Sequence, residues 1–378
     1  MSRFLFVVPP LTGHINPTVG VGGELTARGH DVAWVGHPAT LEPLLPSGSR
    51  ILPALDDRLE ADIGHARQRW LELKGIAVLK FLWEEFLIPL AHAMIPGVQD
   101  AVKQFQPDVL VADQQALAGP VVAIDLGVPW VTSASTPAEL IRPLRTMPKV
   151  DEWVTAQLRE LSGSDVDIRF SGLLVLVFTS PLLVGDAFPP HYAFTGPALA
   201  HRPENTGFPW EWLSPEKRKV LVSLGTLNGA AGHRFFREVI EAVTTMPDVQ
   251  AVMVAPPLDA PHNVLVRERV PQLALMKHMD AVISHGGHNT VCEALAHGLP
   301  LVVAPIRDDQ PIIADQVVSA GAGMRLKYQR ARAGDIHAAL NGVLYDPDFA
   351  ACARRVRESF RLGGGAPAAA DRLEAVVA

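Results

Sequence analysis

Short apolar runs alternate with helical segments along this chain, and the alternation constrains the fold more than any other feature. In the first half the pattern predicts strands at 4–8, 31–35, 108–112 and 130–132, with helices at 17–28 and 120–126. In the second half it predicts strands at 220–224, 250–255, 281–284 and 301–304, with helices at 233–245 and 289–297. Strands that alternate with helices favour a parallel sheet covered by helices on both faces.

The restart of the pattern indicates two domains in a chain of 378 residues. The stretch between the halves contains Gly196-Pro197 and Gly207-Phe208-Pro209, and such Pro- and Gly-rich sequence is typical of an interdomain linker. We therefore predict an α/β protein whose two Rossmann-like domains, 1–200 and 215–378, face each other across a cleft and are joined by a linker at 201–214.

Charge and composition argue against several classes of protein. The formal net charge is −7, whereas a chain that holds nucleic acid usually carries a basic surplus. The two cysteines, Cys292 and Cys352, lie far apart and fit neither a disulfide nor a metal framework. No apolar stretch approaches the ~20 residues that a membrane span needs, and the first apolar run stops at Pro9. We predict a cytoplasmic protein without a membrane span, a bound metal or a nucleic-acid partner.

The run His285-Gly286-Gly287-His288-Asn289-Thr290 connects a predicted strand to a predicted helix. The two glycines let the backbone turn sharply and approach a ligand, and the start of a helix presents N–H groups and a partial positive charge that suit a diphosphate. Asn289 and Thr290 can cap this helix and donate to phosphate, and the two histidines add donors. Glu293, one turn further on, is placed to accept hydrogen bonds from ribose hydroxyls. A plain capped turn with a solvated Glu293 is the alternative interpretation.

Two other segments follow predicted strands of the same half. Asp309 and Gln310 supply a carboxylate and an amide at the carboxyl end of a parallel strand, where open α/β sheets bind ligands, and these groups suit sugar hydroxyls. Ser223, Gly225 and Thr226 suit a second contact to the diphosphate. A polar turn with no ligand is the alternative for both segments.

His14 follows the first predicted strand and is a candidate general base, because imidazole accepts a hydroxyl proton near neutral pH. Asp113 follows the predicted strand 108–112. If these two strands are neighbours in the sheet, the carboxylate lies beside the imidazole, where it selects one tautomer and stabilises the imidazolium.

Three further features suggest chemistry less strongly. The glycines at 20–23 lie inside the first predicted helix and indicate close packing rather than a dinucleotide site. Asp165 and Asp167 have a spacing used for metal-bound nucleotides, but they lie in a polar loop. Either acceptor binding or helix packing accounts for four aromatic residues, namely Trp70, Phe81, Trp83 and Phe86.

Taken together, these motifs resemble the GT-B glycosyltransferases, most closely those of actinomycetes that decorate antibiotics and other natural products. The donor-binding signature of that family is similar to a set of runs in the second half, namely Val270-Pro271-Gln272, 285–290, Glu293-Ala294-Leu295, Gly298-Leu299-Pro300 and Asp309-Gln310-Pro311. Gly13-His14 with Pro17 resembles the family's base motif, and Gly196-Pro197 resembles the end of its N-terminal domain. The likeness covers nearly the whole chain and is looser in the first half. A tryptophan that many plant members place at the start of the signature is replaced by Arg269-Val270, which leaves recognition of the base open.

The resemblance implies an inverting transferase that needs no metal or cofactor. His14 would deprotonate an acceptor hydroxyl with Asp113 as its partner, and Glu293 would hold the ribose. The rest of the implied donor site comprises Val270 at the base, Asp309 and Gln310 at the sugar, and Ser223, Gly225, Thr226, His285, Gly286, Gly287, Asn289 and Thr290 around the diphosphate. The last predicted helix, 349–362, and its tail would return to the first domain.

The substrates follow less directly from the resemblance. It implies a thymidine or uridine diphosphate sugar, with a deoxysugar favoured, and a small, apolar natural-product acceptor in antibiotic biosynthesis. The identities of sugar and acceptor, the regiochemistry and the oligomeric state stay open, a homodimer included. A nucleotide-sugar epimerase of the same fold and a non-catalytic partner of a transferase are the alternative functions. The apolar first half argues against the epimerase, and the presence of both the base and the phosphate turn argues against the partner.

Overall fold

The computed structural model describes residues 1–55, 69–70, 73, 75–185, 187–203, 207–225 and 232–378. The chain forms two compact units, each with one parallel sheet. Unit 1 comprises Met1–Phe178, Ala187–Pro203 and Gly363–Ala378, and unit 2 comprises Thr179–Asp186 and Glu204–Leu362. Residues 179–186, which we predicted in the first domain, belong to unit 2 because Leu183 is buried in the core of that unit.

The sheet of unit 1 has the strand order β3-β2-β1-β4-β5-β6-β7, and every paired strand is parallel. Its strands are β1 (Arg3–Val7), β2 (Asp31–Gly36), β3 (Arg50–Pro53), β4 (Val109–Asp113), β5 (Trp130–Ala134), β6 (Val175–Val177) and β7 (Tyr192–Phe194). The order reverses between β1 and β4, where Val7 is in register with Ala112. In open α/β sheets, ligands bind beyond the carboxyl ends of the strands at such a reversal.

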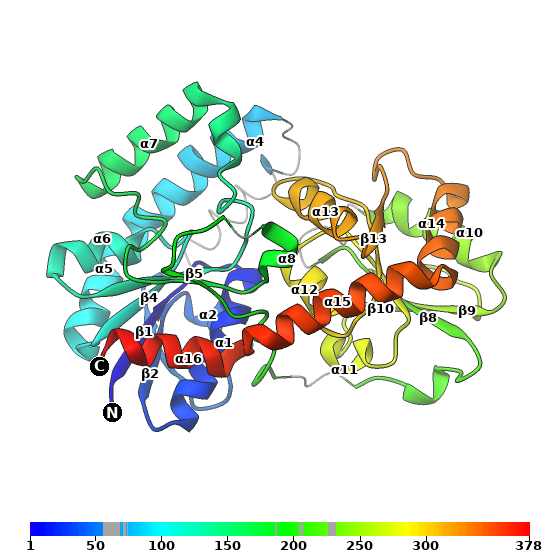
Figure 1. The fold of residues 1–378 in the computed structure, drawn as a ribbon, viewed down its shortest axis with the longest axis horizontal. Helices are drawn as coiled ribbons and strands as arrows, with labels where there is room; N and C mark the ends of the chain where they lie inside the picture. The colour runs from blue at the N-terminus through cyan, green and yellow to red at the C-terminus, as the bar shows by residue number, and fades with distance from the viewer. Residues whose placement is uncertain (56–68, 71–72, 74, 186, 204–206, 226–231) are drawn as a thin grey trace. The chain divides into compact units, whose positions relative to one another are not determined.

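Helices cover both faces of this sheet (Figure 1). They are α1 (Thr12–Ala27), α2 (Pro38–Leu41), α4 (Ile76–Phe81), the π-helix η1 (Leu82–Leu87), α5 (Ile88–Phe105), α6 (Ala118–Leu126), the 3₁₀-helix η2 (Pro143–Thr146), α7 (Pro148–Ser162) and α16 (Gly365–Val376). One face packs against α1 and α16, and the other packs against α5 and α6.

The last helix, α16, lies beside the first helix, α1, within unit 1 (Figure 1, red and blue). Ala366, Ala369, Ala370 and Leu373 recur at helical spacing and are all buried in the same core as α1. Arg28, at the end of α1, pairs with Asp371 and Glu374 of α16. The C-terminal residues therefore complete the core of unit 1.

Helix α1 begins at Thr12, whereas we predicted a turn at 13–16 and a helix from Pro17. The carbonyl of Leu11 accepts the N–H of Ile15 at 3.1 Å, so the first turn closes before Pro17. The glycines of this helix allow close packing, as predicted. A Cβ on Gly22 would lie 2.3 Å from Cζ2 of the buried Trp34.

The sheet of unit 2 has the order β10-β9-β8-β11-β12-β13 and is also parallel, with its reversal between β8 and β11. Its strands are β8 (Arg218–Ser223), β9 (Val249–Val254), β10 (Val264–Arg267), β11 (Ala281–Ser284), β12 (Leu301–Val303) and β13 (Gly323–Arg325). Its helices are α8 (Pro181–Val184), η3 (Trp210–Trp212), α10 (His233–Thr244), α11 (Gln272–Met276), α12 (His288–Ala296), α13 (Gln310–Ser319), α14 (Ala333–Tyr345) and α15 (Pro347–Gly363). Helices α10 and α14 pack on one face, and α11, α12, α13 and α15 pack on the other.

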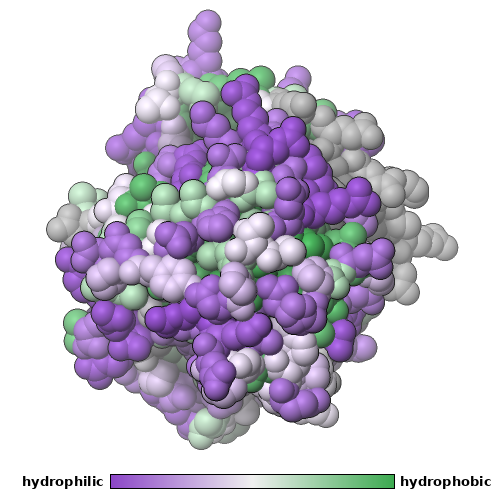
Figure 2. Space-filling view, turned by 90° about the vertical axis from the view of Figure 1, so that its right-hand side faces the viewer, coloured by the Kyte–Doolittle hydropathy of each residue, from purple (hydrophilic) through white to green (hydrophobic). Residues whose placement is uncertain are grey.

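Hydrophobic side chains gather inside each unit. On the face drawn in Figure 2, hydrophilic residues predominate and hydrophobic ones occur in small groups. Among the aromatic residues for which two roles were open, Phe81 and Trp83 are buried, and Trp83 packs with Leu87 and Leu117 in a core cluster. Helix packing therefore accounts for Trp83. None of the described helices is both long enough and apolar enough to span a membrane.

Candidate active site

His14 and Asp113 meet at the reversal of the strand order in unit 1. His14 lies in the first turn of α1, directly after β1, and Asp113 is the last residue of β4. Because β1 and β4 are neighbours, Nδ1 of His14 comes within 2.8 Å of Oδ1 of Asp113. The Asp113 side chain is fully buried, whereas 15% of the His14 side chain is exposed, which keeps the imidazole within reach of a ligand.

The surroundings of Asp113 define the tautomer of His14. Oδ1 of Asp113 also accepts the N–H of Gln115 at 2.9 Å, which holds the carboxylate in place. An ionised carboxylate only accepts hydrogen bonds, so Nδ1 of His14 carries the hydrogen and Nε2 keeps its lone pair. This is the form of imidazole that takes a proton from a hydroxyl group.

Sequence reasoning missed Ser135, whose Oγ lies 2.7 Å from Nδ1 of His14. Ser135 directly follows β5, the strand beside β4, and is buried. A lone serine after a strand has no distinctive local pattern. Its position is the only signal, because it follows β5, and β5 ends at the same edge of the sheet as the strands that place His14 and Asp113.

Glu139 was also missed by sequence reasoning, and it lies in the turn after Ser135. Burial raises the pKa of this carboxyl, the charges of Asp167 and Asp113 add to the rise, and the charges of Arg169 and His14 oppose it. Nη1 of Arg169 is 3.7 Å from Oε2 of Glu139, and the same guanidinium is held by Asp167 through two hydrogen bonds of 2.9 Å. Asp167, one of the two aspartates with a spacing used for metal-bound nucleotides, is therefore bound by an arginine.

The predicted diphosphate turn lies at the reversal of the strand order in unit 2. Ser223 ends β8 and Ser284 ends β11, and the two residues are in register. Each serine hydroxyl accepts a backbone N–H two residues on, from Gly225 at 3.4 Å and from Gly286 at 3.1 Å. Thr226 lies outside the described residues, as does most of the predicted loop at 225–232.

The imidazole of His285 is enclosed between two glycines. A Cβ on Gly225 would lie 2.7 Å from Cε1 of His285, and a Cβ on Gly287 would lie 2.5 Å from its Nε2. Gly225 and Gly286 also have φ angles of +73° and +89°, which favour glycine. Burial lowers the pKa of His285, a hydrogen bond with the backbone of Ser223 opposes the fall, and the charge of Arg307 adds to it. The resulting pKa is about 4, so the ring is neutral at pH 7.

Helix α12 begins at His288, with Gly287 as its N-cap. Asn289 and Thr290 therefore lie in the first turn, and the prediction that they cap the helix is wrong. The reason is that the second glycine already has the extended backbone of a cap, with φ −62° and ψ 132°. The first turn still presents its N–H groups at the carboxyl end of the sheet, the edge at which open α/β sheets bind ligands.

Glu293 lies one turn further along α12 and is only 3% exposed, so it is not a solvated carboxylate. Nε2 of Gln272, at the start of α11, donates to its Oε2 at 2.6 Å. Val270 precedes α11 and packs against the same core cluster as α12. The structure thus brings Glu293, which we predicted at the ribose, into contact with Gln272, which lies two residues after Val270, the predicted contact of the base.

Asp309 and Gln310 start α13 after β12, with Asp309 at the N-cap position. Gln310 is buried, and its Oε1 accepts the N–H groups of Ile306 and Arg307 at 2.9 and 3.1 Å. Its amide oxygen therefore shapes the loop after β12.

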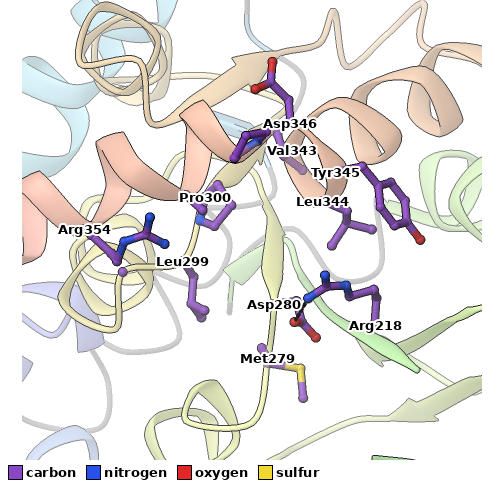
Figure 3. A pocket seen from close by; sticks show the side chains of 13 residues that line it. Arg218, Met279, Asp280, Leu299, Pro300, Val343, Leu344, Tyr345, Asp346 and Arg354 are labelled. Atoms are coloured by element: carbon purple, nitrogen blue, oxygen red, sulfur yellow. Dashed lines mark hydrogen bonds and ion pairs between the residues drawn. The ribbon is translucent and has the colours of Figure 1, made fainter. Parts of the chain in front are cut away.

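A cavity of about 400 Å³ lies at the opposite edge of this sheet (Figure 3). Arg218 opens β8 there, and Asp280 and Pro300 directly precede β11 and β12. Arg218 and Asp280 point toward each other in this cavity and pair at 2.9 Å. None of the predicted site residues lines it.

Comparisons with known proteins agree with the resemblance seen in the sequence. Residues 238–371 match the family model described as erythromycin biosynthesis protein CIII-like, C-terminal domain. The chain is 28% identical to 4'-demethylrebeccamycin synthase of Lentzea aerocolonigenes, over 100% of both chains. It is also 28% identical to demethyllactenocin mycarosyltransferase of Streptomyces fradiae, over 100% of this chain and 87% of that protein. The solved structure of spinosyn rhamnosyltransferase SpnG complexed with thymidine diphosphate has a similar fold, with a TM-score of 0.77 and 23% identity over 98% of this chain and 100% of that chain.

Proposed function

Since this chain is a glycosyltransferase with the GT-B fold and is similar to transferases of antibiotic biosynthesis, we propose that it transfers a deoxysugar from thymidine diphosphate to a hydroxyl group of a small, apolar natural product. The transfer inverts the anomeric centre and needs no metal. The observation that carries the proposal is the hydrogen bond of 2.8 Å between His14 and the buried Asp113 at the ligand-binding edge of its sheet. A uridine diphosphate sugar is the alternative donor.

His14 acts as the general base in this proposal. Its Nε2 takes the proton of the acceptor hydroxyl while the oxygen attacks the anomeric carbon from the face opposite the diphosphate. The ring becomes an imidazolium, and the negative charge of Asp113, 2.8 Å from Nδ1, stabilises it. Attack from the opposite face inverts the configuration of that carbon.

The diphosphate gains negative charge as its bond to the sugar breaks. We propose that the first turn of α12, the neutral imidazole of His285 and the hydroxyl of Thr290 offset this charge. These are preorganised donors, so the site stabilises the leaving group without a metal ion. Ser223, Gly225, Gly286, Gly287 and Asn289 shape the same turn.

Contacts to the rest of the donor follow from the same placement. Glu293, oriented by Gln272, accepts from the sugar of the nucleoside, and the backbone at Val270 meets the base. Asp309 accepts from hydroxyls of the transferred sugar. Because Oε1 of Gln310 already accepts two backbone N–H groups, Nε2 of Gln310 is the atom that we assign to the sugar.

Titration calorimetry tests the donor. We expect thymidine diphosphate to bind more tightly than uridine diphosphate, and the reverse order would assign the donor to uridine. Glu293→Gln is expected to weaken either nucleotide without unfolding unit 2, because Gln272 still has an oxygen to donate to.

Transfer is tested with a thymidine diphosphate deoxysugar and a panel of apolar hydroxylated compounds, with and without a metal chelator. Mass spectrometry detects the product, and proton NMR reports an inverted anomeric centre. Conversion of the nucleotide sugar to an isomer without an acceptor would instead indicate an epimerase. His14→Ala is expected to lower kcat by at least about 100-fold, whereas His92→Ala, on the exposed side of α5, leaves it unchanged.

A further inference from the structure

Ser135 contacts the same nitrogen of His14 that Asp113 does. We propose that Ser135 is a positioning residue for the base: its hydroxyl oxygen shares the Nδ1–H of His14 and holds the ring with Nε2 toward the acceptor. The inference rests on the proposed function only in giving His14 the role of base. Oγ of Ser135 lies 2.7 Å from Nδ1, and Oδ1 of Asp113 lies 2.8 Å from the same atom.

The backbone after β5 places this hydroxyl. The N–H of Ser135 bonds to the carbonyl of Ser133 at 3.2 Å, which makes a tight turn at the end of the strand. Ser133 is in register with Asp113 across the β4–β5 pair, so the turn begins level with the carboxylate. Ser135 is 3% exposed, and its side chain is thus enclosed by the protein rather than by solvent.

The count of hydrogens decides which group donates. Nδ1 holds at most one hydrogen, and two oxygens lie within bonding distance of it. If Ser135 donated to Nδ1, the lone pair of that nitrogen would also face the Asp113 carboxylate at 2.8 Å, and the two would repel each other. The hydrogen therefore belongs to Nδ1 and is shared between the carboxylate and the hydroxyl in a three-centre bond.

Two acceptors restrain the ring more than one does. The rotation of an imidazole about its last side-chain bond is soft, so a single hydrogen bond leaves the ring free to tilt. Oδ1 of Asp113 lies at the end of β4 and Oγ of Ser135 lies just after β5, so two neighbouring backbone segments hold the position of Nδ1. When the acceptor proton arrives at Nε2, Nδ1–H becomes a stronger donor and both bonds strengthen.

The first test compares Ser135→Ala with Ser135→Thr, which keeps the hydroxyl. We expect Ser135→Ala to lower kcat about tenfold at an unchanged KM for the nucleotide sugar, and Ser135→Thr to restore most of the rate. Ser49→Ala, in a loop of the same unit, serves as the matched control. Wild-type kcat in Ser135→Ala, or an equal loss in Ser135→Thr without any change of the ring spectrum, would overturn the inference.

The second test needs no acceptor. Nitrogen-15 NMR of the His14 ring is expected to show the Nδ1–H tautomer in the wild type and in Ser135→Ala, because Asp113 still accepts from Nδ1. The chemical shift of Nδ1 is expected to change in Ser135→Ala, because one of its two acceptors is lost. An unchanged Nδ1 chemical shift in Ser135→Ala would count against the shared hydrogen. If His14→Ala keeps full activity, the proposed function fails; if His14→Ala is inactive and Ser135→Ala matches the wild type, only the present inference fails.

A double-mutant cycle with Asp113→Asn completes the design. Because Asp113 and Ser135 act on one N–H group, the loss in the double variant is expected to be smaller than the product of the two single losses. Multiplicative losses would show that the two residues act independently, and the shared bond would be refuted.

Discussion

Replacing Gly287 with Ala tests whether the buried imidazole of His285 binds the diphosphate. The backbone of Gly287, with φ −62° and ψ 132°, suits alanine, so the substitution introduces no backbone strain. Its largest direct effect is steric, because the new Cβ would lie 2.5 Å from Nε2 and 2.7 Å from Cε1 of His285. The ring must move by about 0.9 Å to reach ordinary van der Waals contact.

The size of the effect follows from two contributions. Crowding a packed site costs roughly 1–3 kcal/mol of folding stability. A displaced ring also loses the hydrogen bond that we propose between His285 and the charged diphosphate, and a bond of this kind is worth about 1.5–3 kcal/mol. We therefore expect the Kd for thymidine diphosphate to rise by about 10- to 150-fold in titration calorimetry.

Two further variants separate this mechanism from a general defect. Gly334→Ala adds a methyl group in α14 where no atom lies within 4 Å, so it is expected to bind like the wild type. His285→Ala removes the ring that the new methyl group would strike, so the double variant His285→Ala/Gly287→Ala should bind as His285→Ala does. Wild-type affinity in Gly287→Ala, or a double variant about tenfold weaker than His285→Ala, would refute the reasoning.

Three other substitutions test the packing and electrostatics of unit 1. Gly22→Ala places a Cβ 2.3 Å from the buried Trp34 ring and is expected to destabilise the unit by roughly 1–3 kcal/mol in chemical denaturation, with unchanged affinity for thymidine diphosphate. Leu373→Ala empties a fully buried site on α16 and is expected to cost about 2–5 kcal/mol, again with unchanged nucleotide binding; a loss below that range would contradict the role of α16 in the core. Glu139→Gln removes a carboxyl whose pKa is raised mainly by burial. A raised pKa means that the protonated carboxyl stabilises the fold at low pH, and that this contribution is lost as the pH rises above 4.5. The melting temperature of the variant minus that of the wild type should therefore increase as the pH is raised from 5 to 8. A decrease in this difference would contradict the direction of the pKa shift.

Local chemistry determined most of the elements that we predicted to within a few residues. The apolar run before the two glycines was predicted as a strand at 281–284, and β11 spans Ala281–Ser284. The helix predicted at 233–245 is α10, His233–Thr244. These elements depend on side-chain pattern and turn residues within a short window, which the sequence contains in full. The start of α1 was predicted too late because Pro17 is typical of a helix start, whereas the first turn had already closed on the carbonyl of Leu11.

The candidate sites depend on contacts between distant parts of the chain. His14 and Asp113 were each marked by their positions after a strand, but their contact requires β1 to lie beside β4, and no local pattern specifies that order. Ser135 had no pattern of its own, and its contact with His14 follows from β5 lying next to β4. The sequence also could not show that Gln310 uses its amide oxygen to hold the loop after β12.

The predicted diphosphate turn depends on both local sequence pattern and long-range contacts. Gly286 and Gly287 between a strand and a helix, with Asn289, Thr290 and Glu293 after them, predicted a phosphate site from residue types alone. The tertiary structure decided that His285 is enclosed by Gly225 and Gly287 and is therefore neutral, because the first of these glycines follows β8, sixty residues earlier in the sequence. Turn and helix propensities act between neighbours along the chain, whereas burial and charge are set by whichever segments the sheet brings together.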